Sequence, residues 1–278
     1  MKNYKITIQY EGTRFQGWQR QTSTDNTIQG KIEAILSKMC GVPVEINGAG
    51  RTDAGVHAKG QVANFKINTD KSSAEIMNYL NMYLPEDIAV VDIAEADDRF
   101  HARLNAKGKH YQYRLRIAGT ADVFSRRTVC GYGEIPNVRG SEEVLKDTSD
   151  ISSGQKLFDA KTQREPSKFN VDAMRQAAQL LSGKHDFKAF TSNHRTKKST
   201  VRTIDIRIKE TPEELIFDYT GDGFLYHMVR ILTGTLIEVG EGKRTPESME
   251  AILQSEERSN AGALVPAKGL TLLEVYYE

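Results

Sequence analysis

The chain has 278 residues, of which 38% are hydrophobic and 27% are charged, and its 38 basic and 37 acidic residues give a formal net charge of +1. This composition is typical of a soluble globular protein with a sizeable core, and it lacks a global basic excess for nucleic acid. Two cysteines, Cys40 and Cys130, exclude a disulfide scaffold and a zinc ribbon, and such sparse thiols fit a reducing cytoplasm. We expect no signal peptide, because the N-terminus MKNYKITIQYEG turns polar at once, and no membrane span, because no run approaches the roughly 20 apolar residues that a span needs.

The first third of the chain predicts the order β-α-β-β-α-β, which is the split βαβ unit. Apolar residues at helical spacing predict a helix over residues 27–40, and a second helix ends before Pro85. Short apolar runs bounded by turn residues predict the strands. In chain order the expected elements are strand 5–10, helix 27–40, strands 42–47 and 61–67, helix 73–84 and strand 88–94.

The rest of the chain repeats this pattern without repeating the sequence. The expected elements are strand 109–117, helix 171–182, strands 201–209 and 215–219, helices 224–239 and 246–254, and strand 270–277. Two such units joined edge to edge would form one long, mostly antiparallel sheet, with helices on one face and an open cleft on the other. We therefore expect an α+β fold with halves at residues 1–105 and 106–278. Residues 136–167, rich in Ser, Asp, Lys and Gly, predict a mobile loop insertion.

A glycine-rich loop, GAGRTDAGVH at residues 48–57, is the first candidate site. Its glycines are incompatible with a regular helix or strand and permit close backbone approach. Arg51, Asp53 and His57 therefore lie on a loop between two strands, and loops on rigid scaffolds carry many catalytic groups. The alternative is a tight turn with a solvated aspartate and a surface arginine.

Two further stretches are candidates for binding a polyanion. Residues 100–116 interleave basic and aromatic side chains, so that lysines and arginines could hold phosphates while a tyrosine stacks on an unpaired base. Residues 14–20, RFQGWQR, combine the only tryptophan with two arginines and could grip an RNA backbone. The alternatives are an amphipathic strand with core tyrosines and a turn that buries Trp18.

One arginine, Arg230, lies within the apolar helix expected at residues 224–239. A charge inside such a helix is costly unless it is paired, and Asp53 or Glu238 could serve as its acid. The alternative is an exposed helix position. The sequence contains no GxxxxGK[ST], HExxH or GxSxG motif, and no spacing of His, Cys or carboxylate residues suggests a metal site.

The run GAGRTDAGVHA at residues 48–58 resembles the signature loop of the TruA family of tRNA pseudouridine synthases. The resemblance continues in order along most of the chain. Its other blocks are YEGTRFQGWQRQ (10–21), GQVANF (60–65), NMYLPEDIAV (81–90), FHAR with KGKHYQY (100–113), GDGFLYHMVRILTG (221–234) and AKGLTLLEV (267–275). The insertion at residues 136–167 is longer than we expect for the family.

The resemblance implies a fold, a reaction and partners. The fold would consist of two ferredoxin-like, RNA-recognition-like halves that share a central sheet, in agreement with the pattern above. The reaction would convert uridine to pseudouridine in the anticodon stem-loop, at tRNA positions 38 to 40. The partners would be tRNA and a second copy of the chain, and no cofactor or catalytic metal is expected.

The resemblance also implies roles for single residues. Asp53 matches the catalytic aspartate, which attacks C1′ or removes a ribose proton, and Arg230 matches the arginine that pairs with it. Tyr111 matches the active-site tyrosine, which would stack under the uracil and help remove the C5 proton. Arg51 resembles the arginine that takes the place of the flipped base. Further RNA contacts are expected from Arg14, Arg20, Arg103, Lys107 and Lys109, and from Leu225 or Phe224 in the base pocket.

Three rival hypotheses remain at this point. The chain could be an RNA-binding module of the same fold that has lost catalysis, although Asp53, Tyr111 and Arg230 are all present. It could be a pseudouridine synthase that acts on another RNA site, because a family resemblance predicts the reaction more firmly than the substrate. It could also be a hydrolase that uses Asp53 with a water molecule.

Overall fold

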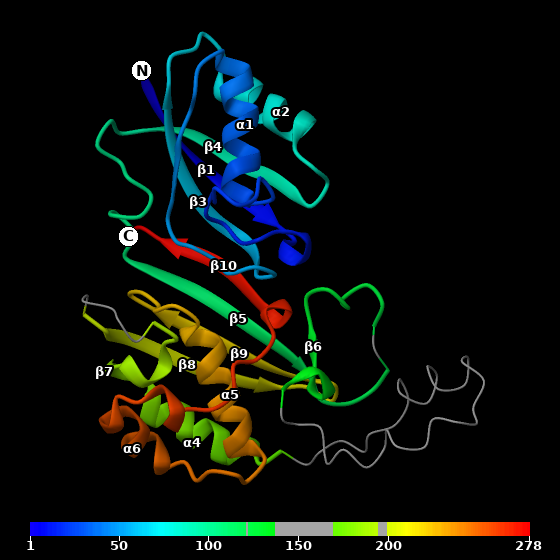
Figure 1. Cartoon of the computed structure of the whole chain (residues 1–278), viewed down its shortest axis with the longest axis vertical. Coiled ribbons are helices and arrows are strands. Elements are labelled where there is room, and N and C mark those ends of the chain that lie inside the picture. The colour runs from blue at the N-terminus through cyan, green and yellow to red at the C-terminus, as the bar shows by residue number, and fades with distance from the viewer. Residues whose placement is uncertain (121, 137–168, 194–198) are drawn as a thin grey trace, which may run out of the picture. The chain divides into compact units, whose positions relative to one another are not determined.

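The computed structural model describes residues 1–120, 122–136, 169–193 and 199–278, so nearly all of the insertion expected at residues 136–167 lies outside the described residues. Two compact units are distinguished (Figure 1). The first contains Met1–Gln112, Thr220–Asp222 and Leu270–Glu278, and the second contains Tyr113–Tyr219 and Gly223–Gly269. Both units combine helices with strands, which confirms the predicted α+β class.

The first unit has the predicted β-α-β-β-α-β order. Its elements are β1 (Lys2–Tyr10), α1 (Ile28–Cys40), β2 (Ile46–Gly48), β3 (His57–Ile67), α2 (Ser73–Tyr83) and β4 (Ile88–Ala96). In space the strands follow the order β4-β1-β3-β10, where β10 is Leu270–Tyr276, and β2 pairs with β3. β1 is antiparallel to both of its neighbours, whereas β10 runs parallel to β3 with Thr271 opposite His57.

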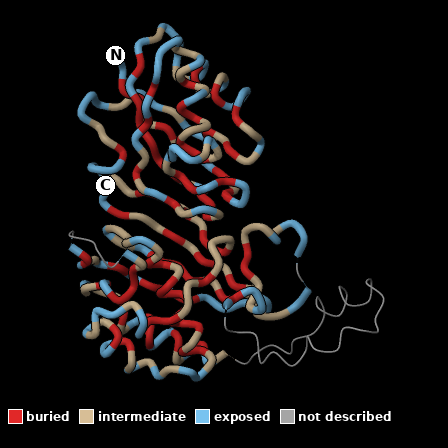
Figure 2. Tube along the Cα trace, viewed as in Figure 1, coloured by how far each residue is buried: buried red, intermediate tan, exposed pale blue. Residues whose placement is uncertain are grey.

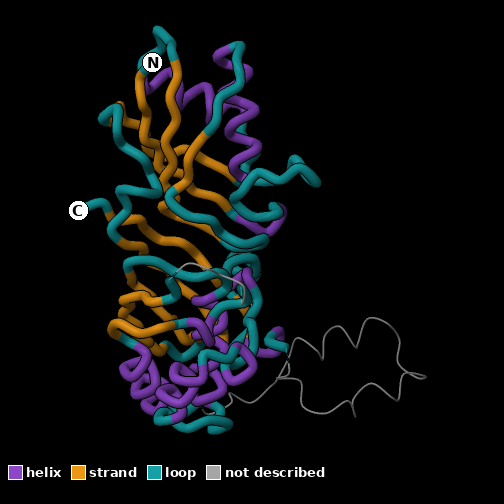
Figure 3. Tube along the Cα trace, turned by 60° about the vertical axis from the view of Figure 1, so that its left-hand side comes forward, coloured by secondary structure: helices purple, strands orange, loops and turns teal. Residues whose placement is uncertain are grey.

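Local sequence signals explain where the two helices of this unit begin and end. The Thr27 hydroxyl accepts a hydrogen bond from the N–H of Gly30 and caps α1, which ends at Gly41 with a φ of 70°. A capping box formed by Ser72 and Glu75 starts α2. Both helices lie on the same side of the strands, and the strands carry long buried stretches (Figures 2 and 3).

The second unit begins within β5 (Gly108–Arg116), whose residues from Tyr113 onward belong to it. Its other elements are β6 (Cys130–Gly131), α4 (Val171–Leu181), β7 (Gly183–Asp186), β8 (Val201–Glu210), β9 (Glu214–Gly221), α5 (Met228–Gly240) and α6 (Ser248–Ser255). The strand order is β5-β9-β8-β7, and β6 pairs with β5. The two strands that the sequence did not predict, β6 and β7, have two and four residues, which is too short for a visible alternation.

Short 3-10 helices complete the described chain, at Gly12–Arg14, Tyr132–Glu134, Lys188–Phe190, Arg258–Asn260 and Ala267–Gly269. The helix predicted over residues 224–239 begins later, at Met228. His227, the residue before it, has a φ of 64°, and this left-handed conformation ends the preceding turn and starts the helix. The entry to α5 is therefore a sharp corner rather than four more residues of helix.

Candidate active site

Asp53 lies in the loop of residues 49–56, which joins β2 to β3. The N–H of Val56 donates to the carbonyl oxygen of Asp53 at 3.2 Å, and Gly55 has a φ of 78°, so the chain turns directly after the aspartate. The Asp53 side chain is half-buried, the preceding Thr52 is buried and Arg51 is exposed. The loop thus presents a carboxylate, Asp53, and a guanidinium, Arg51, two residues apart on a fixed turn between two strands.

The segment after β1, residues 15–18, is bonded to this loop through its backbone. The N–H of Trp18 donates to the carbonyl oxygen of Thr52 at 3.0 Å, and the N–H of Gly55 donates to that of Phe15 at 3.4 Å. Gly17 lies between these bonds with a φ of 86°, and a Cβ added there would lie 2.6 Å from the Thr52 carbonyl oxygen. Only glycine therefore permits the two backbones to approach this closely.

Buried polar side chains support the loop from within the sheet. The hydroxyl oxygens of Tyr10 and Thr52 lie 2.8 Å apart. The side-chain amide of Gln61 donates to the carbonyl oxygen of Gly50 at 3.0 Å and reaches the Tyr10 hydroxyl at 3.5 Å. Burial raises the pKa of Tyr10 to about 12, so its hydroxyl stays protonated at neutral pH.

His57 shapes the loop through its ring nitrogen. Its Nδ1 accepts a hydrogen bond from the backbone N–H of Gly12 at 2.9 Å. A backbone N–H can only donate, so this Nδ1 carries no proton, and its 3.3 Å contact with the Glu11 carboxylate is not an ion pair in that state. A Cβ on Gly12 would lie 2.0 Å from the Val56 carbonyl oxygen, which shows how tightly this corner is packed.

β5 brings Tyr111 and Lys109 to the same loop. Tyr111 is only 7% exposed, and its pKa is raised by burial first and then by electrostatic interaction with Tyr10 and with Asp53. A Cβ on Gly50 would lie 3.1 Å from the Lys109 Nζ atom, so this side chain crosses the glycine. Lys109 therefore contacts the loop at Gly50, and Asp53 lies close enough to Tyr111 for its charge to raise the tyrosine pKa.

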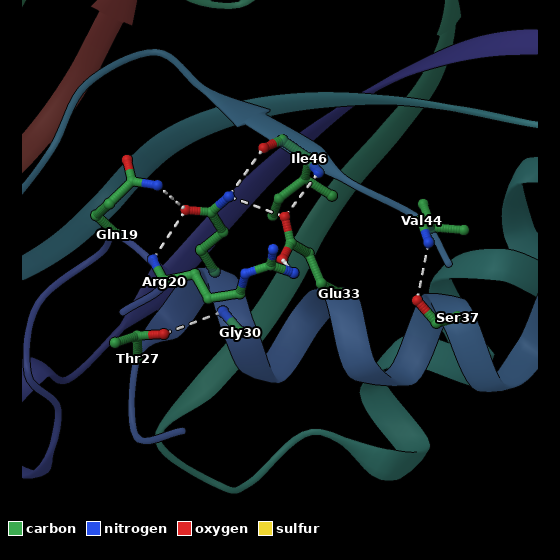
Figure 4. A network of polar contacts seen from close by, with 9 residues as sticks. Gln19, Arg20, Thr27, Gly30, Glu33, Ser37, Val44 and Ile46 are labelled. Atoms are coloured by element: carbon green, nitrogen blue, oxygen red, sulfur yellow. Dashed lines mark hydrogen bonds and ion pairs between the residues drawn. The ribbon is translucent and has the colours of Figure 1, made fainter. Parts of the chain in front are cut away.

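Arg51 and Arg20, both predicted to contact RNA, are already engaged by protein groups. The Nε atom of Arg51 donates to the side-chain oxygen of Gln19 at 3.0 Å. The Nη1 atom of Arg20 lies 3.0 Å from the buried carboxylate of Glu33, although the Arg20 side chain is still 59% exposed. Figure 4 shows the two side chains side by side at α1. Both guanidinium groups are thus oriented by the fold.

The other expected phosphate contacts are spread over the surface of the first unit. Arg14 lies 3.4 Å from the Asp87 carboxylate and is exposed. Arg103 is exposed in the turn that follows β4, and its N–H donates to the Nδ1 atom of His101. Lys107 is exposed directly before β5. The structure does not join these side chains into one cluster with Asp53.

Arg230 and Leu225 belong to the second unit. Arg230 lies in the first turn of α5, half-buried, and its Nε atom donates to the carbonyl oxygen of Val265 at 2.8 Å. Glu238, one of the two acids considered as its partner, instead binds the side chain of Arg244. Leu225 is half-buried at the corner before α5.

The corner before α5 is fixed by a second set of contacts. The Nδ1 atom of His227 lies 2.9 Å from the Ser192 hydroxyl, and the Thr191 hydroxyl donates to the carbonyl oxygen of Tyr226. The ring of Tyr226 stacks on that of His227 with centroids 3.7 Å apart. The left-handed backbone of His227 is held in place by these bonds, and such strained positions recur at functional sites.

Sequence reasoning missed three residues that support the loop, namely Tyr10, Gln19 and Gln61. Only Gln61 carried a usable signal, because an amide in an otherwise apolar strand must find hydrogen-bond partners. Among the described residues no group of three or more His, Cys, Asp or Glu side chains could hold a metal ion. The same part of the chain contains no helix with the length and apolarity needed to cross a membrane.

Comparisons with known proteins agree with one another. A family model described as tRNA pseudouridine synthase matches residues 6–105 and 177–278. A protein of Bacillus sp. (strain KSM-64) named tRNA pseudouridine synthase A is 43% identical over 273 residues, which is 98% of each chain. A protein of Bacillus cereus (strain ZK / E33L) named tRNA pseudouridine synthase A 2 is 40% identical, and one of Clostridium acetobutylicum named tRNA pseudouridine synthase A is 38% identical, each over the full length of both chains.

Proposed function

The chain belongs to the tRNA pseudouridine synthase family, and we propose that it converts uridines of the anticodon stem-loop, at tRNA positions 38 to 40, to pseudouridine. The reaction breaks the N1–C1′ glycosidic bond, rotates the uracil and joins C5 to C1′. The proton on C5 is lost and N1 gains one, so the product is an isomer of the substrate. No redox partner is required.

Asp53 is proposed as the residue that starts the reaction. The target base must leave the RNA stack before a protein group can reach its sugar, as in other enzymes that act on a base. The Asp53 carboxylate then attacks C1′ or removes a ribose proton. Either role needs an ionised carboxylate in a fixed orientation. The turn closed by Gly55 and the bonds to Thr52 support that orientation.

Tyr111 is proposed to stack against the flipped uracil. Its raised pKa keeps the phenol protonated at neutral pH, so the ring acts mainly as an apolar surface with one hydroxyl. Help with removing the C5 proton would then use the hydroxyl in its neutral state. This part of the proposal is supported by the burial of Tyr111, which is 7% exposed, and by the effect of the Asp53 charge, which adds to burial in raising the pKa of Tyr111.

The remaining roles concern charge and binding. Arg230 is proposed to pair with Asp53 in the working enzyme and to keep it anionic. Arg51 is proposed to occupy the space that the flipped base leaves. Phosphate contacts are proposed for Arg14, Arg20, Arg103, Lys107 and Lys109, and a base-pocket contact for Leu225. These contacts would position the RNA without reading its sequence.

We also propose a homodimer that binds tRNA in the cytoplasm, with no cofactor. The proposed compartment is supported by the proposed substrate and by Cys40 and Cys130, which form no disulfide. The division into functional halves at residues 1–105 and 106–278 remains part of the proposal. Gel filtration with light scattering tests the dimer, because a mass near 31.2 kDa would mean a monomer.

The substrate is tested with transcribed tRNA that carries 5-tritiated uridine. Forming the C5–C1′ bond expels the tritium to water. A transcript with uridines at positions 38 to 40 should release it, and a matched transcript with cytidines at these positions should not. Equal release from both transcripts would mean that the enzyme acts at another RNA site.

A further inference from the structure

A chain of side-chain hydrogen bonds runs from the middle of α1 to Arg51. The Glu33 Oε1 atom accepts from the Gln29 Nε2 atom at 2.8 Å. The Gln29 Oε1 atom accepts from the Gln19 Nε2 atom at 2.7 Å, and the Gln19 Oε1 atom accepts from the Arg51 Nε atom at 3.0 Å. Figure 4 shows Gln19, Arg20, Glu33 and the strand residue Ile46 converging above the helix.

The direction of every amide in this chain is determined by groups that can only donate or only accept. The Gln29 Nε2 atom also donates to the carbonyl oxygen of Ile46 at 3.2 Å, and its Oε1 atom also accepts from the N–H of Arg20 at 3.0 Å. A carbonyl oxygen cannot donate and a backbone N–H cannot accept, so Gln29 has one possible orientation. Gln19 must then turn its nitrogen toward Gln29 and its oxygen toward Arg51, because the flipped amide would set two donors against each other.

Gln29 and Glu33, the inner part of this hydrogen-bond network, are held in one arrangement. Glu33 is 4% exposed and Gln29 is 9% exposed, and both are fully engaged. The Glu33 carboxylate also accepts from the N–H of Ile46 at 3.0 Å and binds Arg20. Buried, satisfied polar networks of this kind hold a single arrangement, since any rotation would leave a buried group unpaired. The exposed member is the Arg51 side chain at the outer end.

We propose that Gln19 is a positioning residue that holds the guanidinium of Arg51 in the orientation needed for catalysis, and that Gln29 and Glu33 set the orientation of Gln19. This inference rests on the proposed function, in which Arg51 takes the place of the flipped base. An arginine that is already oriented loses less side-chain entropy as the base flips, a step that follows tRNA binding, so the gain appears in the rate rather than in the Kd. Gln19 touches only Arg51 and Gln29 in this chain of bonds, so its effect passes through Arg51.

A double-mutant cycle of Gln19→Ala and Arg51→Ala tests this role, with single-turnover tritium release and tRNA affinity as readouts. Gln19→Ala should slow release about three- to tenfold, as expected for the net contribution of one ordinary hydrogen bond, and should change the tRNA Kd by less than about twofold. The double variant should be no slower than Arg51→Ala alone. Gln21→Ala, which removes an exposed amide from the same segment, should leave the rate unchanged.

A second cycle tests the inner part of the chain. Gln29→Met should slow release, and the double variant with Gln19→Ala should be no slower than Gln19→Ala alone. Ser37 lies on the same helix but is not part of this hydrogen-bond network, and its hydroxyl accepts from the N–H of Val44. Ser37→Ala removes that bond and should lower the thermal midpoint without changing the rate. This control separates a loss of stability from a loss of positioning.

Several outcomes would overturn the inference. Rate effects of Gln19→Ala and Arg51→Ala that multiply would mean that Gln19 acts on the RNA directly. A Gln19→Ala enzyme with the wild-type rate would exclude a positioning role, and so would an Arg51→Ala enzyme with that rate. The failure of the proposed function looks different, because the wild-type protein itself would then release no tritium.

Discussion

The hydroxyl oxygens of Tyr10 and Thr52 lie 2.8 Å apart, and this contact joins the end of β1 to the residue that directly precedes Asp53. Both residues are buried, at 4% and 7% exposure. The loop that carries the predicted catalytic acid is therefore anchored on the sheet by side-chain bonds as well as by its glycine turn. This rigid support would hold the Asp53 carboxylate in a fixed orientation.

Thr52→Val should weaken both stability and activity. The substitution keeps the size of the side chain but leaves the buried Tyr10 hydroxyl with only its 3.5 Å contact to Gln61. A buried hydroxyl without a good partner costs about 1–3 kcal/mol of unfolding free energy, which urea denaturation can measure. Thr52→Ser retains the hydroxyl and should lose less stability. Equal losses in the two variants would mean that the methyl contacts, rather than the hydrogen bond, hold the loop.

Gly17→Ala should cost more than Gly41→Ala, although both glycines have positive φ. At Gly41 (φ 70°) nothing lies within 4 Å of an added Cβ, so only the left-handed strain of about 1–2 kcal/mol applies. At Gly17 (φ 86°) the Cβ would also lie 2.6 Å from the Thr52 carbonyl oxygen and would displace the loop. We expect a larger fall in the unfolding free energy, together with at least about a tenfold loss of kcat/KM, for Gly17→Ala alone. Similar activity in both variants would show that the loop position does not matter for catalysis.

Most of the fold was predictable because its signals are local. The spacing of Ile28, Ile32 and Leu36 predicted α1 to within one residue, and Pro85 marked the end of α2. Where tertiary contacts decide the conformation, the predictions were less accurate. The helix predicted over residues 224–239 begins four residues later in the structure, because His227 adopts a left-handed φ that no local sequence pattern predicts.

The sequence predicted the loop that carries Asp53, but not the distant residues that hold this loop in place. The glycines around Asp53 predicted a loop, and the loop exists. The partners of that loop are distant in sequence, because Gln61 and Tyr10 reach it only through strand pairing. The contact between Glu33 and Arg20 could not be predicted from the sequence either, since an acid at a helical position is normally solvated. The catalytic and binding roles themselves remain predictions.

The affinity for tRNA should fall as salt rises, despite the net charge of +1. Arg103→Gln should reduce the slope of log Kd against log salt by about 1, because Arg103 is expected to hold one phosphate. Arg207→Gln is the matched control, since Arg207 is exposed and is paired with Asp205 in β8. Fluorescence anisotropy over a salt series gives the slopes. An affinity that does not change with salt would contradict a phosphate-based contact.

Stability should fall at alkaline pH because several tyrosines are buried. Burial raises the pKa of Tyr10 to about 12 and raises those of Tyr111 and Tyr219 further, from an ordinary value of 10. The folded state therefore keeps protons that the unfolded state loses, so this stabilisation is complete below about pH 10 and is lost as the pH rises through the folded pKa values. Each tyrosine contributes up to about 1.4 kcal/mol per pH unit in that range.

Urea midpoints between pH 8 and pH 11 measure this effect. Tyr219→Phe removes one of the retained protons and should flatten the decline above pH 10. Tyr226→Phe, whose parent ring is 54% exposed, serves as the control and should leave the decline as it is. A midpoint that stays constant from pH 8 to pH 11 would contradict the predicted retention of these protons.

Tritium release from tRNA with 5-tritiated uridine decides whether Asp53 carries out the isomerisation of uridine. Wild-type protein and Asp53→Asn are compared at equal tRNA occupancy, with the tRNA Kd of each measured in parallel. The account predicts release by the wild type, no release above background by Asp53→Asn, and Kd values within about twofold of each other. Release by Asp53→Asn at the wild-type rate would contradict the role of this aspartate, and no release by either protein would contradict the proposed reaction.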